Sequence, residues 1–241
     1  RFFVRTVYRT DPQRTPPMEQ MRSQFEPVAN RFEMDFAIHD SRSRSRVLIM
    51  VSKFDHCLND LLYRQRIGEL PMEITAVVSN HPDLRRLTEW HEIPFHHLPV
   101  TEQTKAAAEN RLLEIVAQTR TDLVVLARYM QILSDNLCNQ LAGRAINIHH
   151  SFLPGFKGAK PYHQAFERGV KLIGATAHYV TADLDEGPII EQVVEPVDHN
   201  YRPENLVTAG RDSECRALAR AVKYHLEHRV FVNGNKTVVF R

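Results

Sequence analysis

Short apolar runs recur along most of the chain and are separated by stretches with helical spacing. The runs that follow residue 46 lie at 47–51, 73–78, 95–100 and 122–126. The helical stretches between them lie near 56–67, 83–90 and 103–118. Predominantly apolar runs of this length are typical of strands that are buried on both faces. The alternation therefore predicts an α/β fold with a doubly wound, mostly parallel sheet.

The C-terminal part of the chain adds further elements of the same two kinds. Strand-like runs occupy 144–149, 173–180 and 189–194, and a long helix is expected at about 203–226. The segment 230–240 is apolar on both sides of Asn233-Gly234. Because Asn-Gly favours the tight turns that join antiparallel strands, this segment is predicted to be a β-hairpin.

The N-terminal part has a different order of elements. Residues 1–8 alternate like a strand, 18–32 carry apolar side chains at helical spacing, and 34–39 alternate again. Strand, helix and strand make half of a small α+β module, so we interpret residues 1–40 as part of such a domain. The polar segment 41–46 is the predicted linker, and 47–241 is the predicted main domain. Since the chain opens with Arg1 inside a strand-like run, we expect further residues upstream.

Composition narrows the class of protein without identifying it. The 241 residues are 43% hydrophobic and 25% charged, which is ordinary for a globular protein, and the formal net charge is +2. So small a charge argues against nucleic acid as a partner, and no apolar run is long enough for a membrane span. Cys57, Cys138 and Cys215 are too far apart to suggest a disulfide framework or a metal motif. We therefore expect a cytoplasmic protein.

Polar side chains that suit catalysis occur where two predicted strands end. In the run 144–149 the isoleucines share one face, so Asn147 and His149 share the other, where the strand gives way to a loop. Asp185 lies in a turn rich in Gly and Pro between two later strands. An amide, an imidazole and a carboxylate could therefore meet in one pocket. The alternative is structural: Asn147 and His149 would cap backbone groups, and Asp185 would be an ordinary turn residue.

The two polar segments resemble the signature of the folate-dependent formyltransferase family. That signature is Asn-x-His on a strand, here Asn147 and His149, followed later by an Asp-x-Gly turn, here at Asp185. His150 and Ser151 come next, as in the deformylase members of the family, whereas its glycinamide ribonucleotide transferases have Pro-Ser there. The resemblance covers about residues 47–241 and implies a formyltransferase-like fold.

The resemblance also implies a reaction, the hydrolysis of 10-formyltetrahydrofolate to formate and tetrahydrofolate for one-carbon and purine metabolism. The folate would be the substrate, and no further cofactor is implied. The alternative on the same scaffold is formyl transfer to a small amine such as glycinamide ribonucleotide. A folate- or amino-acid-binding regulatory protein without turnover is a second alternative, from a different class of protein.

Hydrolysis of a formyl amide needs a base for water, donors for the oxyanion and an acid for the departing nitrogen. A buried carboxylate has a raised pKa, so Asp185 is the expected base, and the resemblance favours it over Asp183. The amide of Asn147 and a ring N–H of His149 are the expected donors to the oxyanion. These three residues are the predicted catalytic set.

The folate site is also implied by the resemblance. The residues after the fourth strand of the main domain match the family segment that lines the pterin site, and they are Tyr129, Met130, Gln131, Ile132 and Leu133. Asp183 and Leu184 are expected beside them. Gln131 stands where the family usually has a basic residue, so a contact through its side chain is left open. The alternative is that the segment is only an apolar patch at the start of a helix.

The loop after the first strand of the main domain argues for water as the acceptor. The family's glycinamide ribonucleotide transferases have a Gly-rich loop there, whose backbone N–H groups hold the substrate phosphate. Residues 51–59 contain no glycine, and Phe54 and Asp55 stand in this loop. The sequence therefore favours hydrolysis over transfer.

Two other kinds of site fit the sequence less well. His149, His150, His163 and His178 are candidate metal ligands, but no metal-binding spacing organises them, so we expect no metal. Ser151 has no base fixed to it by the sequence, which disfavours a Ser-His hydrolase. His150 and Ser151 are instead expected to position the loop, and His150 would face away from His149 if the strand continued.

For residues 1–40 the resemblance implies a partial regulatory domain of the ferredoxin-like ACT type. Such a domain would bind an amino-acid effector, glycine or methionine. The resemblance further implies a homo-oligomer. Neither nucleic acid nor a membrane is an expected partner.

Overall fold

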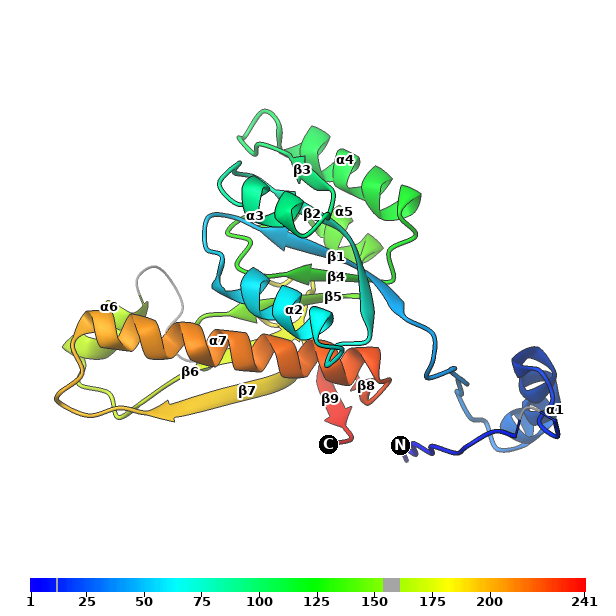
Figure 1. Ribbon diagram of the computed structural model, residues 1–241. Helices are drawn as coiled ribbons and strands as arrows, with labels where there is room; N and C mark the ends of the chain where they lie inside the picture. The colour runs from blue at the N-terminus through cyan, green and yellow to red at the C-terminus, as the bar shows by residue number, and fades with distance from the viewer. Residues whose placement is uncertain (12, 154–160) are drawn as a thin grey trace. The chain divides into compact units, whose positions relative to one another are not determined.

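The computed structural model describes residues 1–11, 13–153 and 161–241 (Figure 1). Within them the chain forms two compact units, 1–44 and 45–241. The loop after the Asn-x-His motif therefore lies partly outside the described residues, because its segment 154–160 is not among them.

The first unit contains the helix α1 (Met18–Arg31), close to the predicted 18–32. Phe25 of this helix meets Phe36 edge-on, with 5.0 Å between the ring centroids. The predicted strands at 1–8 and 34–39 are wrong, because neither segment is a strand in the structure. A strand needs a hydrogen-bonded partner, and all the paired strands of the described chain lie in the second unit. An alternating pattern alone does not supply that partner.

The second unit is built on a sheet whose strand order, over the described residues, is β3-β2-β1-β4-β5-β6-β7. The strands are β1 (Ser45–Val51), β2 (Met72–Ser79), β3 (Phe95–His97), β4 (Leu123–Leu126), β5 (Ala145–His149), β6 (Leu172–Tyr179) and β7 (Ile189–Pro196). β1 to β5 run parallel, while β6 and β7 are each antiparallel to the preceding strand. The prediction of a mostly parallel sheet is confirmed.

The sheet begins earlier than predicted, since Ser45 and Arg46 belong to β1 rather than to the linker. The backbone N–H of Arg46 donates to Asp122 Oδ2 at 2.7 Å, and its guanidinium pairs with Glu73 at 2.8 Å. These contacts with neighbouring segments of the sheet hold two polar residues in a strand. A pattern based on apolar residues does not detect them.

Helices cover both faces of the sheet (Figure 1). They are α2 (His56–Arg66), α3 (Arg85–Trp90), α4 (Lys105–Gln118), α5 (Asp135–Gln140), α6 (Pro161–Glu167) and α7 (Pro203–Leu226). Val47, Ile49 and Val51 of β1 share a core with α2 and α7, whereas Leu48 and Met50 share one with α4 and α5. Because both faces are buried, the strand is apolar at successive positions. The sequence predicted α2, α3, α4 and α7 but not the short α5 and α6.

A two-stranded hairpin follows α7. Its strands are β8 (Val230–Asn233) and β9 (Lys236–Val239), as predicted around Asn233-Gly234. Gly234 has a φ of 64°, in the left-handed region that such a turn requires. The hydroxyl of Thr237 donates to the carbonyl of Ile189 and so ties the hairpin to β7. Among the described helices, none combines the length and the apolar character needed to cross a bilayer.

The sheet topology positions the candidate site. The strand order reverses between β1 and β4, and open α/β sheets bind ligands beyond the carboxyl ends of strands at such a point. β6 runs antiparallel to β5, with His178 opposite Asn147 and Thr176 opposite His149. Because β6 ends beside the start of β5, the turn that follows it must fold back along β5 to reach His149.

Acidification is expected to weaken the second unit through His225 of α7. Burial lowers the pKa of His225 to about 4, His228 adds to this effect, and neutral His225 accepts from the Tyr179 hydroxyl at 2.7 Å. Below about pH 6.5 the unfolded chain binds a proton here that the folded chain does not, so stability falls from there to about pH 4. The free energy of unfolding lost through His225 is expected to be about 3 kcal/mol, at about 1.4 kcal/mol per pKa unit.

Chemical denaturation near neutrality and near pH 4 measures this effect. The variant His225→Gln cannot take up the proton, so we expect its free energy of unfolding to fall less on acidification than that of the wild type. An equal loss in the two proteins would show that His225 does not carry the effect.

Candidate active site

β5 and β6 bring an amide and an imidazole together. Asn147 Nδ2 in β5 lies 3.3 Å from His178 Nε2 in β6. His178 Nδ1 donates to the backbone carbonyl of Tyr179 at 2.8 Å, so Nε2 of the neutral ring accepts from the Asn147 amide. Asn147 retains a second amide N–H for another partner.

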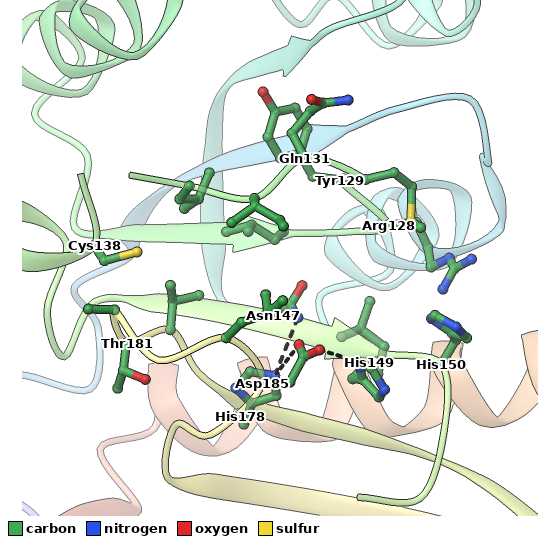
Figure 2. A pocket seen from close by; sticks show the side chains of 18 residues that line it. Arg128, Tyr129, Gln131, Cys138, Asn147, His149, His150, His178, Thr181 and Asp185 are labelled. Carbon is green, nitrogen blue, oxygen red and sulfur yellow. Dashed lines mark hydrogen bonds and ion pairs between the residues drawn. The ribbon is translucent and has the colours of Figure 1, made fainter. Parts of the chain in front are cut away.

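The turn between β6 and β7 adds a carboxylate, as Figure 2 shows. Asp185 Oδ2 lies 3.3 Å from His149 Nδ1, and Oδ1 lies 3.7 Å from His178 Nε2. Asp185 has a φ of 59°, in the left-handed region that Asp tolerates better than most residues. The structure thus brings Asn147, His149 and Asp185 together.

His178 joins these residues, although the sequence suggested it only as a candidate metal ligand. It lies within reach of both Asn147 and Asp185, and it is 3% exposed. Its place near the end of a predicted strand, shortly before the Asp185 turn, was a usable signal. The pairing of β5 with β6, which sets it opposite Asn147, is not visible in the sequence.

The expectation that Asp185 has a raised pKa is wrong. Burial does raise the pKa of Asp185, but the neighbouring imidazoles of His149 and His178 outweigh it, so the pKa lies well below that of a free aspartate. Asp185 is therefore ionised.

His149 offers one ring nitrogen to a ligand. Its ring stacks on that of His150 with 4.9 Å between centroids, and its Nδ1 faces Asp185. Nε2 is buried and has no hydrogen-bond partner among the described residues. Because a buried polar atom without a partner is costly, Nε2 marks a position where substrate or water binds.

His150 and Ser151 lie next to this histidine. The strand does not continue to His150, because β5 ends at His149, and the His150 ring stacks on that of His149 instead of facing away from it. Ser151 is buried, and its backbone carbonyl accepts from Thr176 Oγ1 at 3.0 Å. This bond ties the loop after β5 to β6.

The catalytic-type side chains open into a pocket of about 280 Å³. The whole predicted pterin segment lines it, namely Tyr129, Met130, Gln131, Ile132 and Leu133. Leu184 lines it as well, but Asp183 does not. Asp183 is exposed, and its backbone carbonyl accepts from Thr181 Oγ1 inside the turn. Asp183 thus shapes the turn through its backbone.

Arg128 is a pocket residue that the sequence analysis missed. It directly precedes the pterin segment, and its φ of 65° is in the left-handed region, where the chain turns out of β4. Its charge was visible in the sequence. Arg128 lines the pocket because of this backbone turn, and no Gly or Pro in the sequence indicates the turn.

Polar side chains hold the pterin segment at both ends, and the one at its start is buried. At the start, Ser52 accepts from the backbone N–H of Met130 at 2.9 Å and donates to Asn80 Oδ1 at 2.6 Å. After the segment, Glu109 accepts from the backbone N–H of Ser134 at 2.9 Å and from its hydroxyl. The segment is therefore fixed before a ligand arrives.

We expect Ser52→Ala to raise KM for the folate substrate implied by the resemblance about tenfold, with little change in kcat. Loss of the hydroxyl leaves the Met130 N–H and the Asn80 carbonyl unsatisfied, at about 1–3 kcal/mol, and frees the pterin segment. Steady-state kinetics measures the split. Thr88→Val is the matched control, since Thr88 is a buried hydroxyl that bonds Leu84 away from the pocket, and its KM should not change. An unchanged KM in Ser52→Ala would contradict the positioning role.

The four histidines weighed as candidate metal ligands do not converge on one point within the described residues. His149 and His178 converge on Asp185, while the side chain of His163 is exposed. Within the described ranges, the ligand atoms close enough to hold a metal ion belong to His56, Cys57 and Glu214, all within 4.8 Å of one another.

Comparison with known proteins identifies the class. A family model described as formyl transferase matches residues 45–222. A formyltetrahydrofolate deformylase from Corynebacterium sp. (strain P-1) is 60% identical over 93% of this chain and 78% of that protein. The protein of the same name from Bacillus subtilis (strain 168) is 50% identical over 91% of this chain and 73% of that protein.

Solved structures agree with these relatives. Formyltetrahydrofolate deformylase from Burkholderia mallei ATCC 23344 matches with a TM-score of 0.90 and 62% identity, over 93% of this chain and 80% of that one. Glycinamide ribonucleotide transformylase 1 from Symbiobacterium toebii matches with a TM-score of 0.76 and 29% identity, over 86% of this chain and 99% of that one. The chain therefore belongs to the formyl transferase family. Within that family its relatives place it with the formyltetrahydrofolate deformylases.

Proposed function

We propose that this chain hydrolyses 10-formyltetrahydrofolate to formate and tetrahydrofolate. The observation that carries the proposal is the carboxylate of Asp185, which lies between His149 and His178 at a pocket lined by residues 129–133. The relatives named formyltetrahydrofolate deformylase support the same substrate and reaction. The products would supply formate and free tetrahydrofolate to one-carbon and purine metabolism.

Attack by water on the formyl carbon moves negative charge onto the formyl oxygen. His149, protonated in its ion pair with Asp185, offers the unpartnered Nε2–H, and Asn147 offers its second amide N–H. Such a donor, fixed in a site that excludes water, typically stabilises the transition state by about 3–4 kcal/mol. These two groups are the proposed oxyanion donors.

Asp185 takes a proton from the attacking water. Its lowered pKa makes it a weak base toward free water, but the water becomes acidic as the C–O bond forms, and the transfer occurs then. The C–N bond breaks as N10 of the folate takes the proton from His149 Nε2. Ionisation of Asp185 and of the formic acid product then returns one proton to His149 and releases the other to solvent.

Formyl transfer to a small amine is the alternative function. It is favoured by the fold shared with glycinamide ribonucleotide transformylase 1 from Symbiobacterium toebii. The loop after β1 argues against it, because it carries the exposed Phe54 and Asp55 and no glycine. The charge of Asp55 would repel a phosphate, and Phe54 stands where backbone N–H groups would have to approach one.

A formate-release assay with 10-formyltetrahydrofolate tests the proposed function. We expect the same rate of formate release with and without glycinamide ribonucleotide, and no formylated amine. Formylated ribonucleotide at a comparable rate would make the chain a transferase. Folded protein that binds the folate without releasing formate would instead be a binding protein.

We further propose that the reaction uses no cofactor beyond the folate and takes place in the cytoplasm. For the first unit we propose an ACT-type role, with glycine or methionine as effector, in a homo-oligomer. Its apolar surface supports this proposal, because Phe2, Val4, Val7 and Phe32 are each more than half exposed. Large apolar side chains left exposed can mark a surface that packs against another chain or domain.

A further inference from the structure

A row of three side chains crosses the sheet at the end of β5. His149 of β5 is opposite Thr176 of β6, and Thr176 is opposite Gln192 of β7. Residues directly opposite one another in antiparallel strands point to the same face, with about 5 Å between their Cβ atoms. Thr176 therefore lies beside His149. Its side chain is fully buried, so its hydroxyl must find its partners within the protein.

The Thr176 hydroxyl binds the loop that follows β5. It donates to the backbone carbonyl of Ser151 at 3.0 Å and accepts from the backbone N–H of Leu153 at 3.1 Å. It also accepts from Gln192 Nε2 at 3.1 Å, and the same amide donates to the backbone carbonyl of Leu153 at 3.1 Å. A hydroxyl has one hydrogen to donate and two lone pairs, so the capacity of Thr176 is fully used.

These bonds determine the course of the loop. β5 ends at His149, the backbone bends at the next residue, and Ser151 and Leu153 lie against β6 and β7. Because the chain turns here instead of continuing along β5, the ring of His150 lies on that of His149, with 4.9 Å between the centroids (Figure 2). The stacked arrangement is thus a consequence of the turn that the two side chains hold.

The orientation of the His149 ring depends on this stacking. Nε2 is the proposed oxyanion donor, and the ring's other nitrogen, Nδ1, lies 3.3 Å from Asp185. A contact through one atom leaves the ring able to pivot about that atom, whereas a ring stacked on its face removes this freedom. A displacement of about 1 Å at a catalytic group can cost about 10²-fold in rate. A small pivot of His149 would therefore slow the reaction.

We propose that Thr176 and Gln192 form a clamp on the loop after β5, which holds the His150 ring against His149 and so positions Nε2 for catalysis. Neither residue of the clamp lines the pocket. Both are therefore positioning residues that act through His149. The inference rests on the proposed hydrolysis and adds to it the residues that orient its oxyanion donor.

The test is Thr176→Val, which keeps the shape of the side chain and removes the hydroxyl. We expect kcat for formate release to fall about 10–10²-fold. KM should change little, because Ser52 and Glu109 hold the pterin segment independently. Thr176→Ser keeps the hydroxyl and should have nearly the kcat of the wild type. Unchanged kcat in Thr176→Val would overturn the proposal.

Thr75→Val is the matched control for loss of a buried hydroxyl. Thr75 lies in β2 of the same sheet and donates to the backbone carbonyl of Val47 at 3.3 Å. We expect its Tm to fall while kcat stays that of the wild type. An equal loss of kcat in Thr75→Val and Thr176→Val would show a general effect of destabilising the sheet, and it would contradict the clamp.

The His149→Ala background separates positioning from a structural role. The ring that the clamp orients is absent there, so Thr176→Val should lower kcat little further. The same fold-loss in both backgrounds would mean that Thr176 does not act through His149. If Thr176→Val does not fold, Gln192→Met gives the same comparison. Its side chain has a similar length but donates no hydrogen bond, and we expect a smaller loss of kcat that also disappears without His149.

NMR of the histidine ring nitrogens gives a readout that needs no turnover. The resonances of His149 are assigned by their absence from His149→Ala. We expect them to shift in Thr176→Val and in Gln192→Met but not in Thr75→Val. Resonances of His149 that stay at their wild-type positions in both clamp variants would overturn the proposal. If they shift as expected while the wild type releases no formate, the clamp stands and the proposed function is contradicted instead.

Discussion

The substitution Asp185→Asn is expected to lower kcat for formate release by about 10²–10⁴-fold. The amide has the same shape and keeps the turn, but it accepts no proton from water and cannot hold His149 as an ion pair. The folate should still bind, since its pocket is lined by residues 129–133. Formate release at saturating 10-formyltetrahydrofolate measures the loss, and thermal unfolding confirms that the variant is folded.

Asp183→Asn is the matched control for this substitution. Asp183 lies in the same turn and carries the same charge, but its side chain is exposed and does not line the pocket. Its kcat should be that of the wild type. If Asp185→Asn keeps wild-type turnover, or if both variants lose it equally, Asp185 is not the base.

Gly187→Ala is expected to reduce both stability and activity. A Cβ at this position would lie 1.7 Å from the carbonyl oxygen of Tyr179 and 3.2 Å from His178 Nδ1. The nearest atom, the Tyr179 carbonyl oxygen, belongs to the backbone and cannot rotate away. The turn must therefore move, and this movement separates Asp185 from His149. Overpacking typically costs about 1–3 kcal/mol. A shift of about 1 Å at catalytic groups typically costs about 10²-fold in rate.

Denaturant unfolding and kcat together measure this effect. Gly143→Ala is the control, because Gly143 has a φ of 73° but nothing lies within 4 Å of its added Cβ. A left-handed alanine costs about 1–2 kcal/mol, so this variant should lose stability while keeping its kcat. Wild-type kcat in Gly187→Ala would show that the catalytic turn tolerates displacement.

The main sheet was predictable because its strands are buried on both faces. In β1, Val47 and Ile49 enter one core and Leu48 and Met50 the other, so the strand is apolar at every step. The first unit shows where this reasoning fails. Alternation at 1–8 and 34–39 resembles a strand, but a strand also needs a partner, and a local pattern carries no information about one.

The candidate site was predictable only in part, for a related reason. Alternation alone put Asn147 and His149 on one side of their strand, whereas Asp185 was chosen by resemblance. The place of His178 follows from the register of β6 on β5, which is a tertiary property. The pKa of Asp185 was predicted in the wrong direction because only burial in a pocket was considered, whereas the imidazoles that outweigh it come together only in the fold.

The most direct test of water as the nucleophile is hydrolysis in water enriched in oxygen-18. Water that attacks the formyl carbon while the C–N bond breaks leaves one solvent oxygen in each molecule of formate. We therefore expect mass spectrometry of formate from a single turnover to show one oxygen-18 atom, with no formylated amine when glycinamide ribonucleotide is present. Formate without the label, or the formyl group recovered on the amine, would contradict hydrolysis at this site.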